Sequence, residues 1–212
     1  MKKTMFIAIV LAAEFFAPLF GKAQGTVYVS SLDQTPNGSE AIGSDSWLAQ
    51  PFRTGTDSGG YVLNSVQLLM DAASGSPSGF SVSIYSSLNP ISNLGNFVGS
   101  DPSAGGVFTY TTSGITLSPS TSYFIVVTAT TPVVEGAYNW STTVGVEVSG
   151  ANQWLISGRL ESSDGSSWNP EARGDIFQMA INVTTVPEPT TYALSALGAL
   201  LLGFHRWRNS SR

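Results

Sequence analysis

The sequence predicts an all-β protein, and three observations support this fold class. Apolar and polar residues alternate in several segments, as in 79–87, where Phe80, Val82 and Ile84 share one side and serines the other. Turn-forming Gly, Pro, Asn and Asp residues recur at intervals of roughly ten to twenty residues. No segment between residues 25 and 186 has a convincing 3.6-residue period with caps. We therefore expect an antiparallel β-sandwich, jelly-roll-like in its connections.

The expected strands follow one another along the domain. They lie at 26–32, 46–52, 64–73, 79–87, 106–112, 122–130, 137–143, 144–150, 153–160 and 176–183. The segment 122–130 is apolar on both sides, which predicts a central strand that is covered on both faces. The stretch NPISNLGNFVGS, at 89–100, is predicted to be a loop.

The N-terminus has the three parts of a secretory signal peptide. Lys2 and Lys3 form the positive region, residues 6–13 form the apolar region, and Gly21-Lys22-Ala23 offers small residues before a cleavage site at Gln24. We expect signal peptidase to remove residues 1–23 and to leave an exported domain at 24–183. An uncleaved membrane anchor is the alternative, although the apolar span is short for one.

The C-terminus consists of a linker at 184–191, an apolar segment at 192–204 and a basic tail at 205–212. As a helix the apolar segment would be about 20 Å long, against a hydrocarbon core of about 30 Å. A core helix is the alternative, but Arg206, Trp207 and Arg208 follow at once, as at a membrane interface. We expect a single transmembrane-like helix with its basic end in the cytoplasm.

Pro187 and Pro189 keep the linker extended, because each proline disfavours helical backbone at the residue before it. Pro187-Glu188-Pro189, the apolar segment and Arg206/Arg208 together resemble the PEP-CTERM sorting signal of Gram-negative bacteria. The resemblance implies recognition by an exosortase while the helix holds the chain in the inner membrane. It further implies delivery to the cell surface or to the exopolysaccharide matrix of a biofilm.

Four phrases of the domain also resemble the choice-of-anchor group of bacterial surface domains, most closely its R type. They are LAQPFRTGT (48–56), YVLNSVQLLMDAASG (61–75), FSVSIYS (80–86) and LSPSTSYFIVV (117–127). This resemblance implies a surface location and a β architecture, and it implies no biochemical activity.

Charge and missing residue types exclude several functions. Residues 25–186 hold three arginines against twelve carboxylates, a net charge of −9, which argues against nucleic-acid binding. The chain has no cysteine, and its one histidine, His205, lies beyond the apolar segment. Ser-His-Asp hydrolysis, Cys-His chemistry and histidine-ligated metals are therefore excluded from the exported domain.

Carboxylates and tryptophans remain as candidate site residues. Glu161, Asp164 and Asp175 are weak candidates for a calcium site, and no other cofactor is expected. Trp154 and Trp168, the latter beside Asn169, are candidates for stacking against sugar rings, with burial in the core as the alternative. A carboxylate pair for glycoside hydrolysis could come from Glu135, Glu147, Glu161, Asp164, Glu171 or Asp175.

These observations favour a non-catalytic protein of the cell surface or exopolysaccharide matrix. A carbohydrate-binding module is the first alternative, and a carboxylate-based glycoside hydrolase or lyase is the second. The expected partners are the two processing enzymes, the membrane before processing and an exopolysaccharide.

Overall fold

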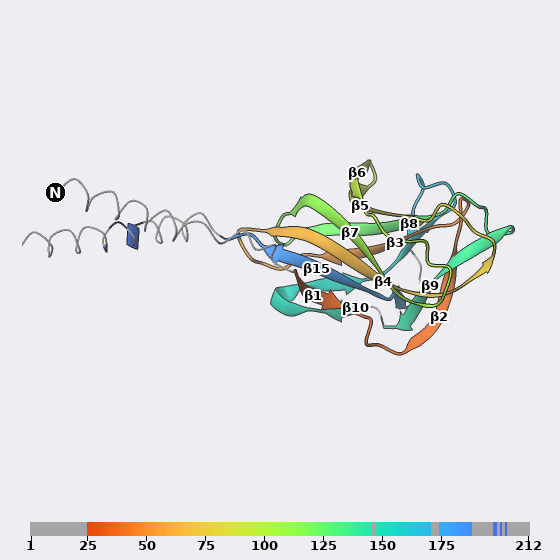
Figure 1. Ribbon diagram of the computed structural model, residues 1–212, viewed down its shortest axis with the longest axis horizontal. Helices are drawn as coiled ribbons and strands as arrows, with labels where there is room; N and C mark the ends of the chain where they lie inside the picture. The colour runs from red at the N-terminus through yellow and green to blue at the C-terminus, as the bar shows by residue number, and fades with distance from the viewer. Residues whose placement is uncertain are drawn as a thin grey trace, which may run out of the picture.

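Two antiparallel sheets face each other across one apolar core (Figure 1). The computed structural model describes residues 25–145, 147–170 and 174–187, together with the four positions 197, 198, 200 and 202. The predicted antiparallel β-sandwich is confirmed.

The first sheet has seven strands. In order they are β1 (Thr26–Ser30), β15 (Met179–Thr185), β4 (Tyr61–Gly75), β9 (Gly136–Val144) and β14 (Asp175–Phe177), while β2 (Pro36–Ile42) pairs with β9 and β7 (Gly106–Leu117) with β4. Its outer face carries polar residues together with a few exposed valines, as in an antiparallel sheet that faces water. Gln67 lies between Ala180 and Thr109 on neighbouring strands, and its amide donates to the Thr109 hydroxyl at 3.3 Å.

The second sheet has eight strands. In order they are β10 (Glu147–Ser149), β11 (Leu155–Ser157), β3 (Trp47–Arg53), β8 (Ser122–Thr128), β5 (Ser81–Leu88) and β6 (Ile91–Asn96), while β12 (Leu160–Ser162) pairs with β3 and with β13 (Asn169–Pro170). A short 3-10 helix, η1 (Ala151–Gln153), lies between β10 and β11. Neighbours in the chain often belong to different sheets, as β3 and β4 or β7 and β8 do, which gives the wrapped connections of a jelly-roll-like fold.

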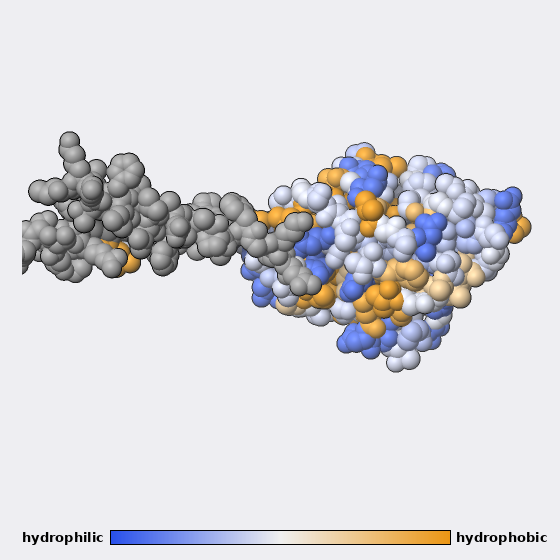
Figure 2. Space-filling model, viewed as in Figure 1, coloured by the Kyte–Doolittle hydropathy of each residue, from blue (hydrophilic) through white to orange (hydrophobic). Residues whose placement is uncertain are grey.

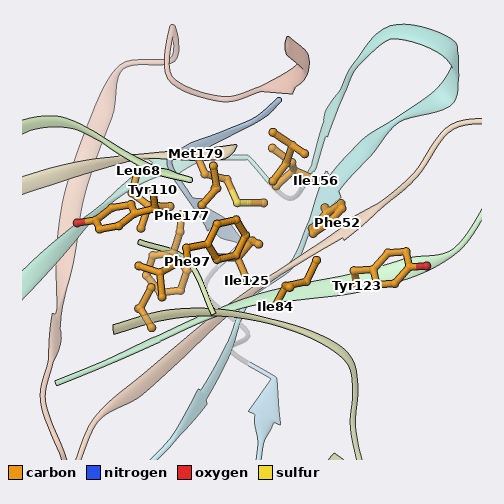
Figure 3. Close-up of a cluster of buried hydrophobic side chains, with 14 of the residues drawn as sticks. Phe52, Leu68, Ile84, Phe97, Tyr110, Tyr123, Ile125, Ile156, Phe177 and Met179 are labelled. Carbon is orange, nitrogen blue, oxygen red and sulfur yellow. The ribbon is translucent and has the colours of Figure 1, made fainter. Parts of the chain in front are cut away.

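The core lies where the inner faces of the two sheets meet. Leu68, Phe177 and Met179 from the seven-stranded sheet point toward Ile84 and Ile125 from the other sheet (Figure 3). Each of these five side chains is at most 1% exposed. Burial of this apolar surface is the main force that holds the sheets together.

Both ends of the domain lie at the same end of the sandwich. Thr26, which begins β1, pairs with Val183 near the end of β15, and Tyr61, which begins β4, pairs with Thr185 (Figure 1). The opposite end of the sandwich therefore points away from the segments that precede and follow the domain in the chain.

The structure differs from the predicted strands in several places, and β2 (Pro36–Ile42) lies in a segment where no strand is predicted. The segment 89–100 is not all loop, because residues 91–96 form β6 along β5. The expected strand 176–183 is two strands, since Gln178 ends the pairing with β9 and the next residue pairs with β4. The sheet also runs to Thr185, so the linker begins later than expected.

The signal peptide at 1–23 and most of the segment after residue 187 lie outside the described residues. Positions 197, 198, 200 and 202 of the predicted apolar helix are described, and all four are helical. No helix among the described residues is long and apolar enough to span a membrane.

Candidate functional site

The sorting segment begins directly where the sheet ends. The Val186 N–H donates to the Gly60 carbonyl at 3.0 Å, which fixes the chain against the β4 end of the sandwich. Pro187 follows as the next described residue, whereas Glu188, Pro189, Arg206 and Arg208 lie outside the described residues. The folded domain therefore ends within one residue of the Pro-Glu-Pro motif.

The outer face of the eight-stranded sheet carries an apolar cluster. This cluster lies separate from the main core, around the buried residues Ala49, Leu88 and Val126. Five half-buried side chains pack on it, and we call this set the outer aromatic face: Trp47, Tyr85, Phe124, Leu160 and Trp168.

Strand register places these side chains on one surface. Leu160 lies opposite Ala49, and Ala49 lies opposite Val126. One pleat further along, Phe124 lies between Pro51 and Tyr85 on the two neighbouring strands. Because side chains directly opposite each other on one face are in contact range, these two rows form an apolar strip that crosses four strands, β12, β3, β8 and β5.

The two indole rings of this face are held by the backbone. The Trp47 Nε1–H donates to the Ser44 carbonyl at 3.1 Å, and the Trp168 Nε1–H donates to the Gly165 carbonyl at 3.2 Å. Gly165 also rests on the Trp47 ring, because a Cβ added there would lie 2.9 Å from its Cε3. The polar atom of each ring is thus satisfied, and the accessible remainder of each ring is carbon surface.

The loop that carries Gly165 is organised by Asp164. Its Oδ1 accepts hydrogen bonds from the backbone N–H groups of Ser166 and Ser167, each at 2.8 Å, and from the Ser162 hydroxyl at 2.9 Å. These bonds, above all the one from Ser167, hold the pKa of the Asp164 carboxyl well below its usual range. The loop therefore depends on an ionised Asp164 for its shape.

A polar pocket of about 280 Å³ adjoins the outer aromatic face. It is lined by Asp45, Ser46, Glu161, Ser162, Ser163 and Asn169. Ser46 precedes Trp47 in the chain, and Asn169 follows Trp168. The Asp45 carboxylate accepts from the Val133 N–H at 2.9 Å, which fixes one wall of the pocket.

The three predicted calcium ligands do not form a ligand set. Glu161 and Asp175 both face Arg159, at 3.6 Å and 3.1 Å, and Asp164 is turned toward the amides of its own loop. A guanidinium group thus lies where a cation would have to bind. No group of three or more His, Cys, Asp or Glu side chains in the described part of the chain is placed to hold a metal ion.

Trp154, the other predicted sugar-stacking residue, is fully buried at 0% exposure. Its ring packs on Phe52 at 6.0 Å and on Tyr61 at 4.9 Å between centroids, at the end of the sandwich where the domain begins and ends. It offers no surface to a ligand, so this candidate is wrong. Trp168 and Asn169 both have solvent-accessible surface, and the structure places them together with Glu161.

The sequence reasoning missed Trp47 and Asp45. Both lie far from Trp168 in the chain, and β3 brings them together by pairing with β12, where Trp47 is opposite Ser162. One signal did point to the outer aromatic face, because segment 122–130 is apolar on both sides. Phe124 and Val126 supply its outer side.

Residues 185–208 match the family model described as the PEP-CTERM protein-sorting motif. The chain carries a PEP-CTERM sorting signal. This signal indicates export, processing by an exosortase and delivery to the cell surface. No curated protein matches the PEP-CTERM chain.

Proposed function

We propose that this PEP-CTERM protein is a non-catalytic module of the bacterial cell surface or its exopolysaccharide matrix. In this proposal the cell is Gram-negative, and the apolar segment holds the precursor in the inner membrane until the exosortase acts. The observation that carries the proposal is the sorting signal at residues 185–208, joined directly to a closed sandwich.

The use of carboxylates in the domain supports a non-catalytic role. Asp71 accepts from the Ser141 hydroxyl and Asp101 from the Tyr138 hydroxyl, each at 2.9 Å. Asp45 and Asp164 accept from backbone N–H groups, as described above. These side chains fix loops and strand ends through hydrogen bonds within the protein, which is a structural role rather than a catalytic one.

A glycoside hydrolase is a second candidate, because Asp45 and Glu161 line the same pocket. Hydrolysis of this kind needs one carboxyl group that is protonated and acts as the acid. Asp45 accepts from a backbone N–H, and Glu161 lies 3.6 Å from the Arg159 guanidinium. Both carboxylates thus already contact protein groups that hold them in place, which argues against a free acid catalyst in this pocket.

The test uses the processed protein, purified from the surface of a host that carries an exosortase. We expect the protein in the surface fraction, and we expect no release of reducing ends from a broad panel of polysaccharides. Release of reducing ends that is lost in Asp45→Asn or Glu161→Gln would establish the hydrolase instead. Retention of unprocessed chain in the cytoplasm would contradict the surface role.

A further inference from the structure

We propose that the outer aromatic face binds an extended, uncharged polysaccharide. This inference rests on the proposed function, because it takes the face to be presented outside the cell by a domain that does not cleave its ligand.

The first argument is the contrast between the two outer faces. The seven-stranded sheet shows water a mixed surface, with Gln67 and Thr109 at its middle and separate exposed valines such as Val107. The eight-stranded sheet shows water the half-buried rings of Trp47, Tyr85 and Trp168. On the face of the molecule seen in Figure 2, apolar residues lie in small areas between hydrophilic ones. An apolar strip with several aromatic rings marks a binding surface rather than an average solvated sheet.

The second argument is that the rings are already fixed. Both indole N–H groups donate to backbone carbonyls, and Gly165 lies against Trp47. A ligand that stacks on these rings therefore orders few side chains when it binds, which lowers the entropic cost. The accessible carbon surface of each ring suits the C–H face of a pyranose.

The third argument is the length of the strip. Trp47 and Tyr85 are four residues apart along the strands and two strands apart across the sheet. With about 3.3 Å per residue and about 4.8 Å between strands, this corresponds to roughly 16 Å. A strip of that length fits a chain of several sugar units rather than a single monosaccharide.

The fourth argument is the choice of polar groups beside the strip. The pocket next to Trp47 and Trp168 offers hydroxyl, amide and carboxylate groups to sugar hydroxyls. At the other end, Ser83 and Asn96 are hydrogen-bonded to each other at 2.8 Å beside Tyr85. Asp45, Glu161 and Asp164 give the pocket end a negative charge, so it repels polyuronates and sulfated chains. Arg53 is an exposed cation on the same face, but three carboxylates outweigh it, so the balance of charge favours an uncharged polysaccharide.

The described domain provides a fluorescence assay for this face. It contains four tryptophans, of which Trp140 and Trp154 are 0% exposed, while Trp47 and Trp168 are half-buried. Quenching by acrylamide in the processed protein therefore reports mainly on the two tryptophans of the outer aromatic face. We would titrate the processed protein with dextran, galactomannan, xyloglucan and alginate, and measure binding in parallel by affinity electrophoresis.

We expect at least one of the three uncharged polysaccharides to protect the tryptophans and to retard the protein, with alginate without effect. Trp168→Ala and Tyr85→Ala should each weaken retardation at least tenfold, whereas Val107→Ala, on the outer face of the other sheet, should leave it unchanged. If a variant does not fold, protection of the wild-type tryptophans still decides the question.

The proposal is overturned if none of the three uncharged polysaccharides protects or retards the protein, or if Trp168→Ala binds as the wild type does. It is also overturned if alginate binds equally well and salt removes the binding. Release of reducing ends during the same titrations would instead overturn the proposed non-catalytic function, so the two failures are distinguishable.

Discussion

Arg159 lies with its Nε 3.1 Å from Oδ1 of Asp175, in the interior of the sandwich, where the Arg159 side chain has no exposed surface. Its Nη2 lies 3.1 Å from Oε1 of Glu40, and its guanidinium carbon lies 5.2 Å from the centre of the Phe177 ring. Arg159 leads into β12 of the eight-stranded sheet, whereas Glu40 and Asp175 belong to the seven-stranded sheet. One cation thus joins the two sheets.

Arg159→Ala should lower the free energy of unfolding by about 3 kcal/mol or more, because it takes their shared cation from Glu40, Glu161 and Asp175 and opens a cavity beside Phe177. Urea unfolding of wild type and variant measures the difference. Arg53→Ala is the control, since Arg53 is exposed, and its change should stay within about 0.5 kcal/mol. Equal effects of the two substitutions would show that the buried ion pairs do not hold the sheets together.

The Asp164 loop should open in acid. A carboxyl whose pKa is lowered in the folded state stabilises the fold above its ordinary pKa of about 3.9, and this contribution is lost as pH falls toward the lowered value. Tryptophan fluorescence should report the opening, because the loop contacts both Trp47 and Trp168.

At neutral pH, Asp164→Ala should already show the tryptophan fluorescence that the wild type shows in acid, since the backbone N–H groups of Ser166 and Ser167 lose their acceptor. Ser163→Ala, in the same loop, is the control and should keep the wild-type titration. A fluorescence that is flat below pH 4 in the wild type would contradict the assigned role of the carboxylate.

The strands were predictable where one side of a segment is apolar, and the failures have a common physical cause. The sequence predicts a loop in place of β6 because Ile91–Asn96 is rich in polar residues, and only its pairing with β5 makes it a strand. Gln178 interrupts an apparently continuous strand because its N–H donates to the Ser141 carbonyl and its amide to the Ser31 and Gln34 carbonyls. Such long-range partners leave no local signal in a sequence.

The candidate site was predictable only in part for the same reason. Trp168 lies among loop-forming residues in the sequence, which predicts an exposed side chain. In the structure this side chain is half-buried, so part of its surface is accessible to solvent. Trp154 also has polar neighbours, Asn152 and Gln153, but its environment is set by Phe52 and Tyr61. The sequence gives no sign of the role of Trp47, because Gly165, which packs on its ring, lies about 120 positions away in the chain. Local composition therefore indicates exposure poorly for a large ring that packs across strands.

Gly165→Ala should displace Trp47. Gly165 has φ of +70°, where a side chain is strained, and an added Cβ would lie 2.9 Å from the Trp47 ring. We expect a loss of about 1–3 kcal/mol in the free energy of unfolding. Acrylamide quenching of tryptophan fluorescence should also increase.

Gly158→Ala is the matched control for this substitution. Its φ is +65°, but no atom lies within 4 Å of the added Cβ, so it carries the backbone strain without the contact. The increase in quenching should be confined to Gly165→Ala. The same quenching in both variants would show that Gly165 does not position Trp47.

Tyr138 should make stability depend on pH in the alkaline range. Burial and the hydrogen bond to Asp101 raise the pKa of Tyr138 to about 12. Since the folded state keeps the proton that the unfolded state loses near pH 10, the free energy of unfolding should decrease between about pH 10 and 12. Urea unfolding at pH 8 and at pH 11 measures this slope.

Tyr138→Phe should reduce that slope and cost about 1 kcal/mol at pH 8, because the hydroxyl donates to Asp101 at 2.9 Å in the wild type. Some decrease should remain, since burial also raises the pKa of Tyr110. A slope that is unchanged in the variant would contradict the assignment to Tyr138.

Replacement of both Pro187 and Pro189 by alanine should block processing of the precursor. Val186 is hydrogen-bonded to Gly60, so the sorting motif begins where the folded sheet ends. Each proline disfavours helical backbone at the residue before it, so the sequence predicts an extended segment for the exosortase to recognise. In an exosortase-bearing host we expect the double variant to accumulate in the membrane fraction at the mass of the chain with its tail. Pro119→Ala, in a turn of the domain, is the control and should be processed like the wild type. Normal processing of the double variant would show that the exosortase does not recognise the Pro-Glu-Pro segment of this chain.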